Sequence, residues 1–386
     1  MKAVSCLHGE LSVVDLPAPR PAAGQLVLDV LRCGICGSDL HAKDHADELA
    51  DAMNAVGYAD SATSDTPVVF GHEFCGEVAE RGRGVPRRFK VGATVVSFPL
   101  LRAHQGVHPT GLSPLASGAY AEQVLAQAAM SFVVPNGLDP NIAALTEPMA
   151  VALHAVRRSE ITKRDAAVVV GCGPVGLAVI CHLKAIGVET IVASEFSPGR
   201  RALAQRCGAT IVVDPAEGSP YDSVGARKGV ITSATALSEL GVSAMEKLRR
   251  LPGWSHLYRT ADKLGAATPK RPVIFECVGT PGVIDSILVA APFYSRIVVV
   301  GVCMGTDHFR PTVAIGKEAD LRFVLGYTPL EFHDTLYLLA DGKLDTTALV
   351  TGTVGLAGVD TAFTALGNPE THAKIVIDPQ SAVTAP

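Results

Sequence analysis

The sequence predicts an α/β protein with two domains, a β-rich domain followed by a doubly wound parallel sheet. The chain has 386 residues, too many for one compact core and close to two domains of about 150 residues each. Short strands punctuated by glycine and proline fill the first 150 residues. From residue 166 onward, apolar runs alternate with helical patterns, as they do in βαβ units.

The predicted strands of the first domain are rich in apolar and β-branched residues. Three prolines, Pro17, Pro19 and Pro21, mark an irregular connection between the first two strands. The predicted strands are Met1–Cys6, Leu26–Cys33, Glu77–Glu80 and Thr94–Phe98.

The second domain opens with Ala166–Val170, an apolar run typical of a parallel strand that is buried on both faces. A helix is predicted next, over Pro174–Gly187. The alternation continues with strands at Thr190–Ser194, Ile211–Asp214, Pro272–Phe275, Arg296–Gly301 and Leu321–Gly326, and helices at Pro198–Cys207 and Pro281–Ala290.

Residues 216–271 interrupt this rhythm. They are rich in Ser, Gly and charged residues, and Ser243–Leu251 forms an amphipathic patch before Trp254. We interpret this stretch as an inserted helical excursion on the second domain, a surface elaboration without chemistry of its own.

Composition excludes several classes of protein. Apolar residues make up 48% and charged residues 18%, which excludes a disordered chain. The net charge of −5, without a basic stripe, argues against nucleic acid or an anionic membrane as a partner. The first residues lack the apolar core of a signal peptide, and the apolar stretch Ala166–Leu183 has glycines and a proline at its centre, unlike a membrane span. Nine scattered cysteines favour a reducing, cytoplasmic location.

A glycine-rich loop predicts a dinucleotide site. It follows a buried strand and opens a helix, the context in which Gly-x-Gly-x-x-Gly binds a pyrophosphate. The helix N-terminus would offer N–H groups and a positive dipole end to the phosphates. The candidate cofactor-binding residues are Gly171, Gly173, Pro174, Val175 and Gly176.

Glu195 ends the next strand, 19 residues after Gly176, where an acid would bind both hydroxyls of the adenosine ribose. An acid there repels a 2′-phosphate, so NAD is favoured over NADP. Arg200 and Arg201 follow and could pair with such a phosphate, but we expect them on the solvated face of the next helix.

Three separated segments offer metal ligands: Cys36, His72 and Glu147. Each can be explained without a metal: Cys36 as a small core side chain, His72 as a hydrogen-bonded histidine and Glu147 as an acid at a helix start. Their residue types are nevertheless all competent zinc ligands.

Taken in order, Cys36-Gly-Ser38-Asp39-Leu-His41, Gly71-His72-Glu73, Glu147-Pro148 and the glycine loop resemble the zinc-dependent medium-chain dehydrogenase/reductase family. The Glu-Pro segment is most similar to its sorbitol and butanediol dehydrogenase branch. Phe275–Gly279 and His372–Val376 are also similar to that family. The resemblance runs to about Asp378 and excludes the insertion.

The resemblance implies a GroES-like catalytic domain over residues 1–150 and a Rossmann domain over 151–327, with the insertion at about 216–271 and a return to the catalytic domain over 328–386. It implies one catalytic Zn²⁺ on Cys36, His72 and Glu147, with a fourth position open. Glu73 would be an alternate ligand or lie just outside the ligand set, and Asp39 would orient His72.

A second, structural zinc is not expected. Many relatives bind it with four closely spaced cysteines, whereas no cysteine occurs here between Cys75 and Cys172. His104 and His108 lie in the corresponding segment, and we expect them in a surface loop.

The activity implied is reversible hydride transfer between a secondary alcohol or polyol and NAD. Ser38 would accept the proton of the alcohol, and His41 would relay it to solvent, with a nicotinamide ribose hydroxyl between them. Arg200, Val278 and Val300 are further candidate cofactor-binding residues.

Several assignments stay open at this point. Tyr120 could contact substrate or pack against a strand, His154 could be core or line the cofactor cleft, and Lys374 could reach the pyrophosphate or be solvated. We expect residues 45–66 to shape substrate access.

The alternatives in function are a reductase of the same fold acting on an activated alkene or imine, and a catalytically retired nucleotide-binding protein. A homodimer or homotetramer is expected, with a contact near Arg296–Tyr327.

Overall fold

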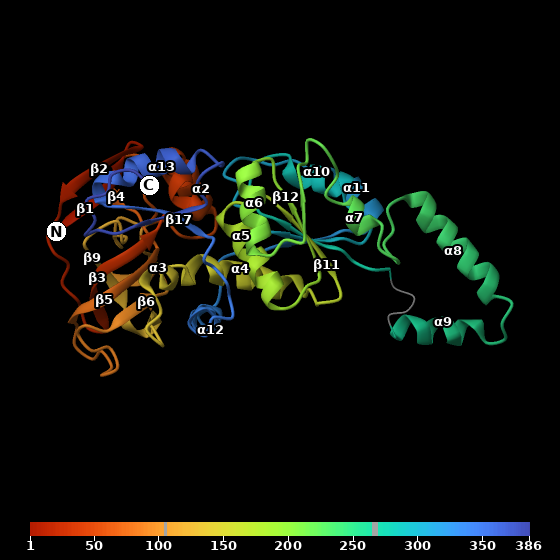
Figure 1. The fold of residues 1–386 in the computed structure, drawn as a ribbon, viewed down its shortest axis with the longest axis horizontal. Coiled ribbons are helices and arrows are strands. Elements are labelled where there is room, and N and C mark those ends of the chain that lie inside the picture. Colours follow the sequence, from red (N-terminus) through yellow and green to blue (C-terminus); the bar gives the residue numbers. More distant parts are fainter. Residues whose placement is uncertain (104–105, 265–268) are drawn as a thin grey trace.

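The computed structural model describes residues 1–103, 106–264 and 269–386, and the molecule is elongated (Figure 1). Both chain termini lie at one end, in the part built around the N-terminal strands. A parallel sheet flanked by helices occupies the middle, and two helices project from the other end.

A seven-stranded sheet holds strands from both ends of the chain. Its order is β10-β6-β5-β3-β18-β17, and β9 also pairs with β3. The strands are β3 (Gln25–Gly34), β5 (Glu73–Arg81), β6 (Thr94–Ser97), β9 (Gln123–Gln127), β10 (Ser131–Val133), β17 (Val350–Val354) and β18 (Lys374–Ile377). Because β18 pairs with β3, the end of the chain completes a sheet that its beginning started.

Smaller elements surround this sheet. A second sheet has the order β2-β1-β4, and a hairpin joins β7 to β8. Their bounds are β1 (Lys2–Leu7), β2 (Glu10–Asp15), β4 (Val68–Val69), β7 (Leu100–Ala103) and β8 (Gly106–Pro109). The helices are α1 (Gly37–Asp44), α2 (Ala46–Ala55), α3 (Pro140–Ala143), α12 (Pro329–Ala340) and α13 (Val359–Leu366), with 3₁₀ turns at Ala128–Met130 and Leu356–Gly358.

The middle of the molecule is a six-stranded parallel sheet of order β13-β12-β11-β14-β15-β16. The strands are β11 (Ala166–Val170), β12 (Thr190–Ser194), β13 (Ile211–Val213), β14 (Val273–Glu276), β15 (Arg296–Val299) and β16 (Asp320–Phe323). This is the doubly wound α/β architecture that the sequence predicts, and β11 and β12 have the predicted bounds.

Both faces of the parallel sheet are covered, which explains its apolar strands. Val169 packs on the side of α4 (Thr146–Ser159), α5 (Pro174–Ala185) and α6 (Pro198–Cys207). Val168 packs on the opposite side, with α10 (Val283–Ala290) and α11 (Pro311–Lys317). Helix α10 begins two residues later than predicted, because its N-cap Gly282 is left-handed (φ 86°).

The described part of residues 216–271 holds three helices, α7 (Asp222–Gly225), α8 (Ala234–Leu248) and α9 (Trp254–Lys263). Helix α8 starts nine residues before the predicted amphipathic patch, because the Ser233 side chain accepts a hydrogen bond from the N–H of Ala236 and caps the helix.

The prediction of a surface loop for His108 is wrong. His108 is buried in β8 rather than exposed in a surface loop, and its ring bonds the Tyr58 hydroxyl (2.9 Å) and the Ala103 carbonyl (3.0 Å). Its partner Tyr58 belongs to the 45–66 connection, so polar contacts tie that connection to the β7–β8 hairpin. His104 lies outside the described residues.

Within the described residues, no helix is both long enough and apolar enough to cross a membrane.

Candidate functional site

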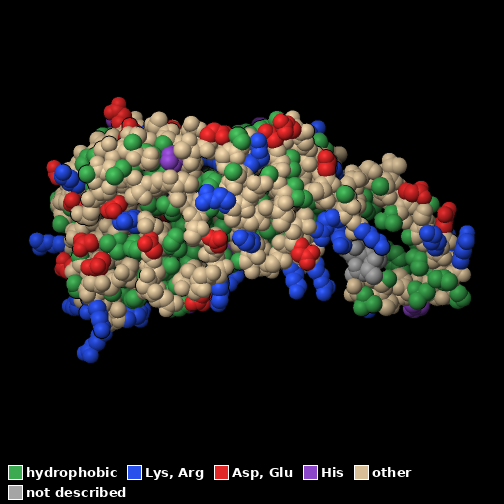
Figure 2. All heavy atoms as spheres, viewed as in Figure 1, with side chains coloured by type: hydrophobic (Ala, Val, Ile, Leu, Met, Phe, Trp, Pro, Cys, Tyr) green, Lys and Arg blue, Asp and Glu red, His purple; other side chains and the backbone are tan. Residues whose placement is uncertain are grey.

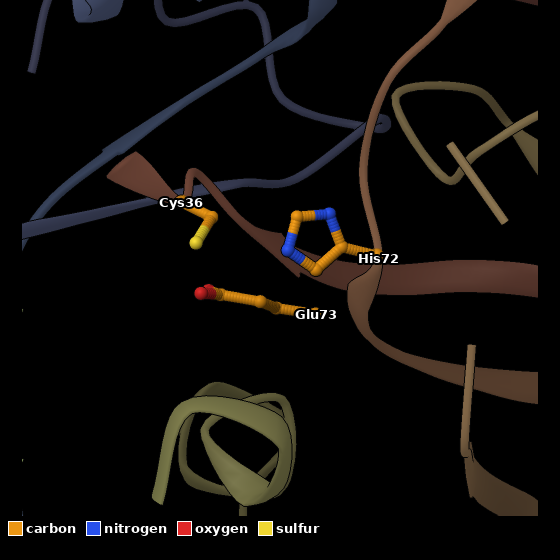
Figure 3. A group of neighbouring side chains, drawn as sticks. All are labelled: Cys36, His72 and Glu73. Carbon is orange, nitrogen blue, oxygen red and sulfur yellow. The ribbon is translucent and has the colours of Figure 1, made fainter. Parts of the chain in front are cut away.

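Three potential metal ligands converge where β3 meets β5. One ligand atom each of Cys36, His72 and Glu73 lies within 4.8 Å of the others, and the side chains face a common space (Figure 3). Cys36 caps helix α1 just after β3, while His72 and Glu73 stand at the start of β5. The strand pairing places Gly34 opposite Glu73, where a Cβ at residue 34 would lie 2.0 Å from the Glu73 carboxylate. A side chain at residue 34 would therefore displace this acid, and glycine leaves room for it.

Glu147 lies beside this group but outside that 4.8 Å cluster. It is buried in the first turn of α4. Burial, followed by the charge of Glu73, raises the pKa of Glu147 to about 7, while His72 acts in the opposite direction. Near Glu147 lies Tyr327, a residue that no sequence motif singled out; burial, followed by the charge of Glu147, raises the pKa of the Tyr327 hydroxyl.

Lys374 neutralises Glu73. Its ammonium nitrogen lies 2.7 Å from each Glu73 carboxylate oxygen and 2.9 Å from the Ile35 carbonyl oxygen. Lys374 is 2% exposed and Glu73 is fully buried. Lys374 is thus neither solvated nor free for a pyrophosphate, the two roles considered from the sequence. It holds the Glu73 carboxylate in place.

Asp39 links the cluster to a buried tyrosine. Its Oδ1 lies 3.3 Å from His72 Nδ1, and its Oδ2 accepts the Cys36 N–H (2.9 Å) and the Tyr120 hydroxyl (2.6 Å). Tyr120 is fully buried, so it does not contact substrate. It fixes the acid that faces His72.

The donor chemistry of these residues fits zinc. A thiol, an imidazole and a buried carboxylate are the ligand types that Zn²⁺ takes, and a carboxylate facing the far ring nitrogen is the usual support for a zinc-bound histidine. His72 Nδ1 and Asp39 Oδ1 are buried without a well-formed hydrogen bond to any described residue. The arrangement leaves the other ring nitrogen, Nε2, to face the cluster.

The two predicted proton-transfer residues lie one helical turn apart on α1. The Ser38 hydroxyl is 3.4 Å from His72 Nε2, so it adjoins the ligand atoms. His41 is only partly buried. Burial, and then the charge of His45, lowers the pKa of His41. A serine beside the cluster and a histidine nearer to solvent form a suitable pair for moving a proton outward.

The glycine loop has the geometry that a pyrophosphate needs. Gly171 is left-handed (φ 87°), and a Cβ on Gly176 would lie 2.0 Å from the Gly171 carbonyl oxygen. Gly173 is the N-cap of α5 and provides no side-chain acceptor for the first N–H groups of the helix. Pro174 occupies the first turn, and Val175 is partly buried behind the loop. The helix end is open to an anion.

Glu195 reaches back to this loop. Its carboxylate accepts the N–H groups of Cys172 (2.8 Å) and Ser197 (3.0 Å). Arg201 does not lie on a solvated face as expected, because its guanidinium binds Asp214 and the carbonyls of Glu195 and Phe196. Arg200 is also only partly exposed, and its Nε is buried without a partner among the described residues.

The two remaining cofactor candidates differ in exposure. Val278 follows β14 and is 40% exposed, whereas Val300 follows β15 and is almost fully buried. The buried carboxylate of Glu276 accepts the N–H groups of Val278 (2.7 Å) and Gly279 (2.9 Å) and so fixes this loop. His154 contributes to neither site, since its ring bonds Glu331 between α4 and α12 (3.0 Å).

Comparison with known proteins agrees with this fold. The family model "Alcohol dehydrogenase GroES-like domain" matches residues 22–136, and "Zinc-binding dehydrogenase" matches residues 174–341. (R,R)-butanediol dehydrogenase of Bacillus subtilis (strain 168) is 32% identical over 381 residues, which cover 96% of this chain and 97% of that protein. Sorbitol dehydrogenase of the same organism is 28% identical over 227 residues, 56% of this chain and 61% of that protein.

Solved structures are similar over nearly the whole length. The X-ray structure of 2R,3R-butanediol dehydrogenase from Bacillus subtilis has a TM-score of 0.73 and 30% identity, covering 98% of this chain and 99% of that one. An NADP-bound putative zinc-binding dehydrogenase from Sinorhizobium meliloti 1021 has a TM-score of 0.73 and 25% identity, with coverages of 98% and 99%.

Proposed function

This chain belongs to the zinc-dependent medium-chain dehydrogenase/reductase family and is an oxidoreductase of the alcohol and polyol dehydrogenase type; on that premise we propose that it interconverts a secondary alcohol or vicinal diol and its ketone, with one zinc per chain and NAD. In the forward direction the alcohol carbon loses a hydride to NAD⁺ and the hydroxyl loses a proton, giving ketone, NADH and H⁺. The convergence of Cys36, His72 and Glu73 beside Ser38 is the observation that carries the proposal.

We assign the metal to Cys36, His72 and Glu147, with Glu73 as an alternate ligand. Lys374 supports this division, because Glu73 already has a cation 2.7 Å away, whereas no cation among the described residues forms an ion pair with Glu147. Bound zinc would polarise the alcohol oxygen and lower its pKa, and NAD⁺ would accept the hydride. A structural zinc is not part of the proposal.

The protein residues then handle the proton and the geometry. Ser38 Oγ accepts the hydroxyl proton of the alcohol, and His41, one turn along α1, passes it toward solvent. Asp39, itself fixed by Tyr120, holds the His72 ring. A serine at residue 38 leaves room for a branched, secondary alcohol, and both butanediol and sorbitol dehydrogenases are similar to this chain.

NAD is the proposed cofactor in preference to NADP. Gly171, Gly173, Pro174, Val175 and Gly176 would hold the pyrophosphate, with Arg200, Val278 and Val300 as further contacts. Glu195, whose carboxylate lies against the same loop, would bind the ribose hydroxyls and repel a 2′-phosphate.

The remaining assignments are proposals of the same kind. The catalytic domain comprises residues 1–150 and 328–386, and the Rossmann domain residues 151–327. The active form is a cytoplasmic homodimer or homotetramer joined at β16, whose outer edge pairs with no other described strand.

Zinc content per chain, measured together with NAD reduction over a panel of secondary alcohols and vicinal diols, tests the proposal. One zinc with alcohol-dependent NADH formation supports it. One zinc without turnover on any alcohol points instead to an alkene or imine reductase, and the absence of zinc would overturn the ligand assignment.

A further inference from the structure

Helices α8 and α9 form an arm, residues 234–264, that projects from the end of the molecule opposite the catalytic domain (Figure 1). Neither helix has a buried residue. Among the described elements, no helix or strand packs extensively on either of them, and they do not pack extensively on each other. No element that the structure describes therefore stabilises the arm by packing on it.

Each helix of the arm nevertheless carries an apolar stripe at helical spacing. Leu240, Leu257 and Leu264 are 55%, 49% and 78% exposed. Figure 2 shows hydrophobic side chains gathered along the inner side of the arm. The stripes comprise Leu237, Leu240, Ala244, Leu248 and Leu251 on the α8 side, and Trp254, Leu257, Tyr258, Ala261 and Leu264 on the α9 side.

Helices of this length are at best marginally stable without packing partners. They have 15 and 10 residues, and isolated helices below about 12 to 15 residues are marginal in water. Most helix stability in proteins comes from packing of the apolar face, so both stripes require a surface that the described part of the chain does not provide.

The charges at the edges of the stripes indicate which surface this is. By helical spacing, Lys247 borders the α8 stripe and Asp262 borders the α9 stripe. Neither forms an ion pair with any residue that the structure describes. Opposite charges at matching positions of two similar stripes are the pattern expected where α8 packs against an α9.

We propose that the arm is an assembly device that packs against the arm of a second copy of this chain. Under a two-fold axis, α8 of each copy lies against α9 of the other, which buries both stripes in a four-helix bundle. Lys247 of each copy then faces Asp262 of the partner subunit, so the two-fold axis creates this ion pair at two places. The inference rests on the homo-oligomer of the proposed function. The arms meet about a two-fold axis of their own, so they join pairs of chains that the β16 edge already links, and loss of the arm contact halves the particle mass.

Particle mass, measured by sedimentation and light scattering at micromolar concentration, tests the inference. Leu240→Glu combined with Leu257→Glu should halve the mass of the wild-type particle. A monomeric wild type, or an unchanged mass in this variant, would overturn the proposal. If the mass is unchanged but the variant loses binding to phosphatidylserine vesicles, the arm docks on a membrane surface instead.

Charge reversal provides a sharper test that keeps the helices intact. Lys247→Glu and Asp262→Lys should each weaken the arm contact by about tenfold in dissociation constant, and the combined variant should recover it. Glu246→Lys, a reversal on the opposite face of α8, is the matched control and should leave the mass unchanged. A combined variant no better than the single ones contradicts the proposal.

Alcohol-dependent NADH formation by the same variants separates this inference from the proposed function. The arm lies far from the metal cluster, so variants of halved mass should keep turnover. If no variant and no wild-type sample oxidises an alcohol, the proposed activity fails while the assembly result stands.

Discussion

The Lys374 ammonium and the Glu73 carboxylate form a fully enclosed ion pair, with the nitrogen 2.7 Å from both oxygens. Burial acts to lower the pKa of Lys374, but the charges of Glu73, Cys36 and Glu147 and the hydrogen bond to Glu73 together outweigh it, so the pKa is raised and the lysine stays charged. The candidate metal cluster thus contains a fixed cation of its own. This cation holds Glu73, and the remaining acid, Glu147, forms no ion pair with any residue that the structure describes.

Replacing Lys374 by Met should destabilise the metal-free protein by about 3 to 5 kcal/mol, because it leaves a buried carboxylate without a counter-charge. Adding Glu73→Gln should restore much of that loss, since the pair is then removed as a unit. Urea unfolding in the presence of a chelator measures both effects. Additive losses in the double variant would show that the two residues do not depend on each other.

Replacing Ser38 by Ala should lower alcohol oxidation by about 10²- to 10⁴-fold, because the hydroxyl that accepts the proton is lost. Zinc content and NADH binding should be unchanged. Ser131→Ala, which removes a buried hydroxyl bonded to Ser97 instead, is the matched control. Full turnover by the Ser38 variant would exclude this residue from proton transfer.

Replacing Glu195 by Ser should reduce the preference for NAD over NADP by about 10- to 100-fold in the ratio of kcat/KM values, because two charge-assisted hydrogen bonds and a repulsion are lost. Glu195→Gln keeps an acceptor for the Cys172 N–H and separates charge from loop geometry. A ratio that neither substitution changes would place the adenosine ribose elsewhere.

The buried His182 predicts a loss of stability in acid. Burial lowers the pKa of His182 to about 4, and its Nε2 bonds the Met149 carbonyl (2.9 Å). Between pH 6.5 and 4 the unfolded chain therefore binds a proton that the folded chain does not, and stability falls as the pH falls, by up to about 3 kcal/mol.

The variant His182→Gln keeps a donor for Met149 and removes this titration. Its free energy of unfolding should decline less steeply than that of the wild type across the same pH range, as measured by urea titrations at each pH. Parallel curves for the two proteins would assign the acid sensitivity to other groups.

The elements that could be predicted from the sequence are those whose local hydrophobic pattern matches their burial in the structure. Ala166–Val170 is apolar throughout because helices cover both faces of β11. The glycine loop can be predicted from a short motif because the close contact of Gly176 with the Gly171 carbonyl lies within the loop itself. The α2 helix gives no such signal, since only Ala50 of its residues is buried.

The supporting contacts of the site could not be predicted in the same way. Tyr120 lies 81 residues from Asp39, and Tyr327 lies further still from Glu147. The position of a tyrosine or a lysine in the sequence does not indicate which buried carboxylate it will contact. Such pairs arise from the register of distant strands, as the pairing of β3 with β5 and β18 illustrates.

The placement of β18 beside β3 has a consequence for biosynthesis. Glu73 and Lys374 are separated by 301 residues, so a ribosome adding about 5 to 20 residues per second makes the lysine about 15 to 60 seconds after the acid. During that interval the Rossmann strands, contiguous from β11 to β16, can fold as a unit. The catalytic sheet is completed only after β18 has been made, and until then the part of β3 that pairs with β18 remains an open sheet edge.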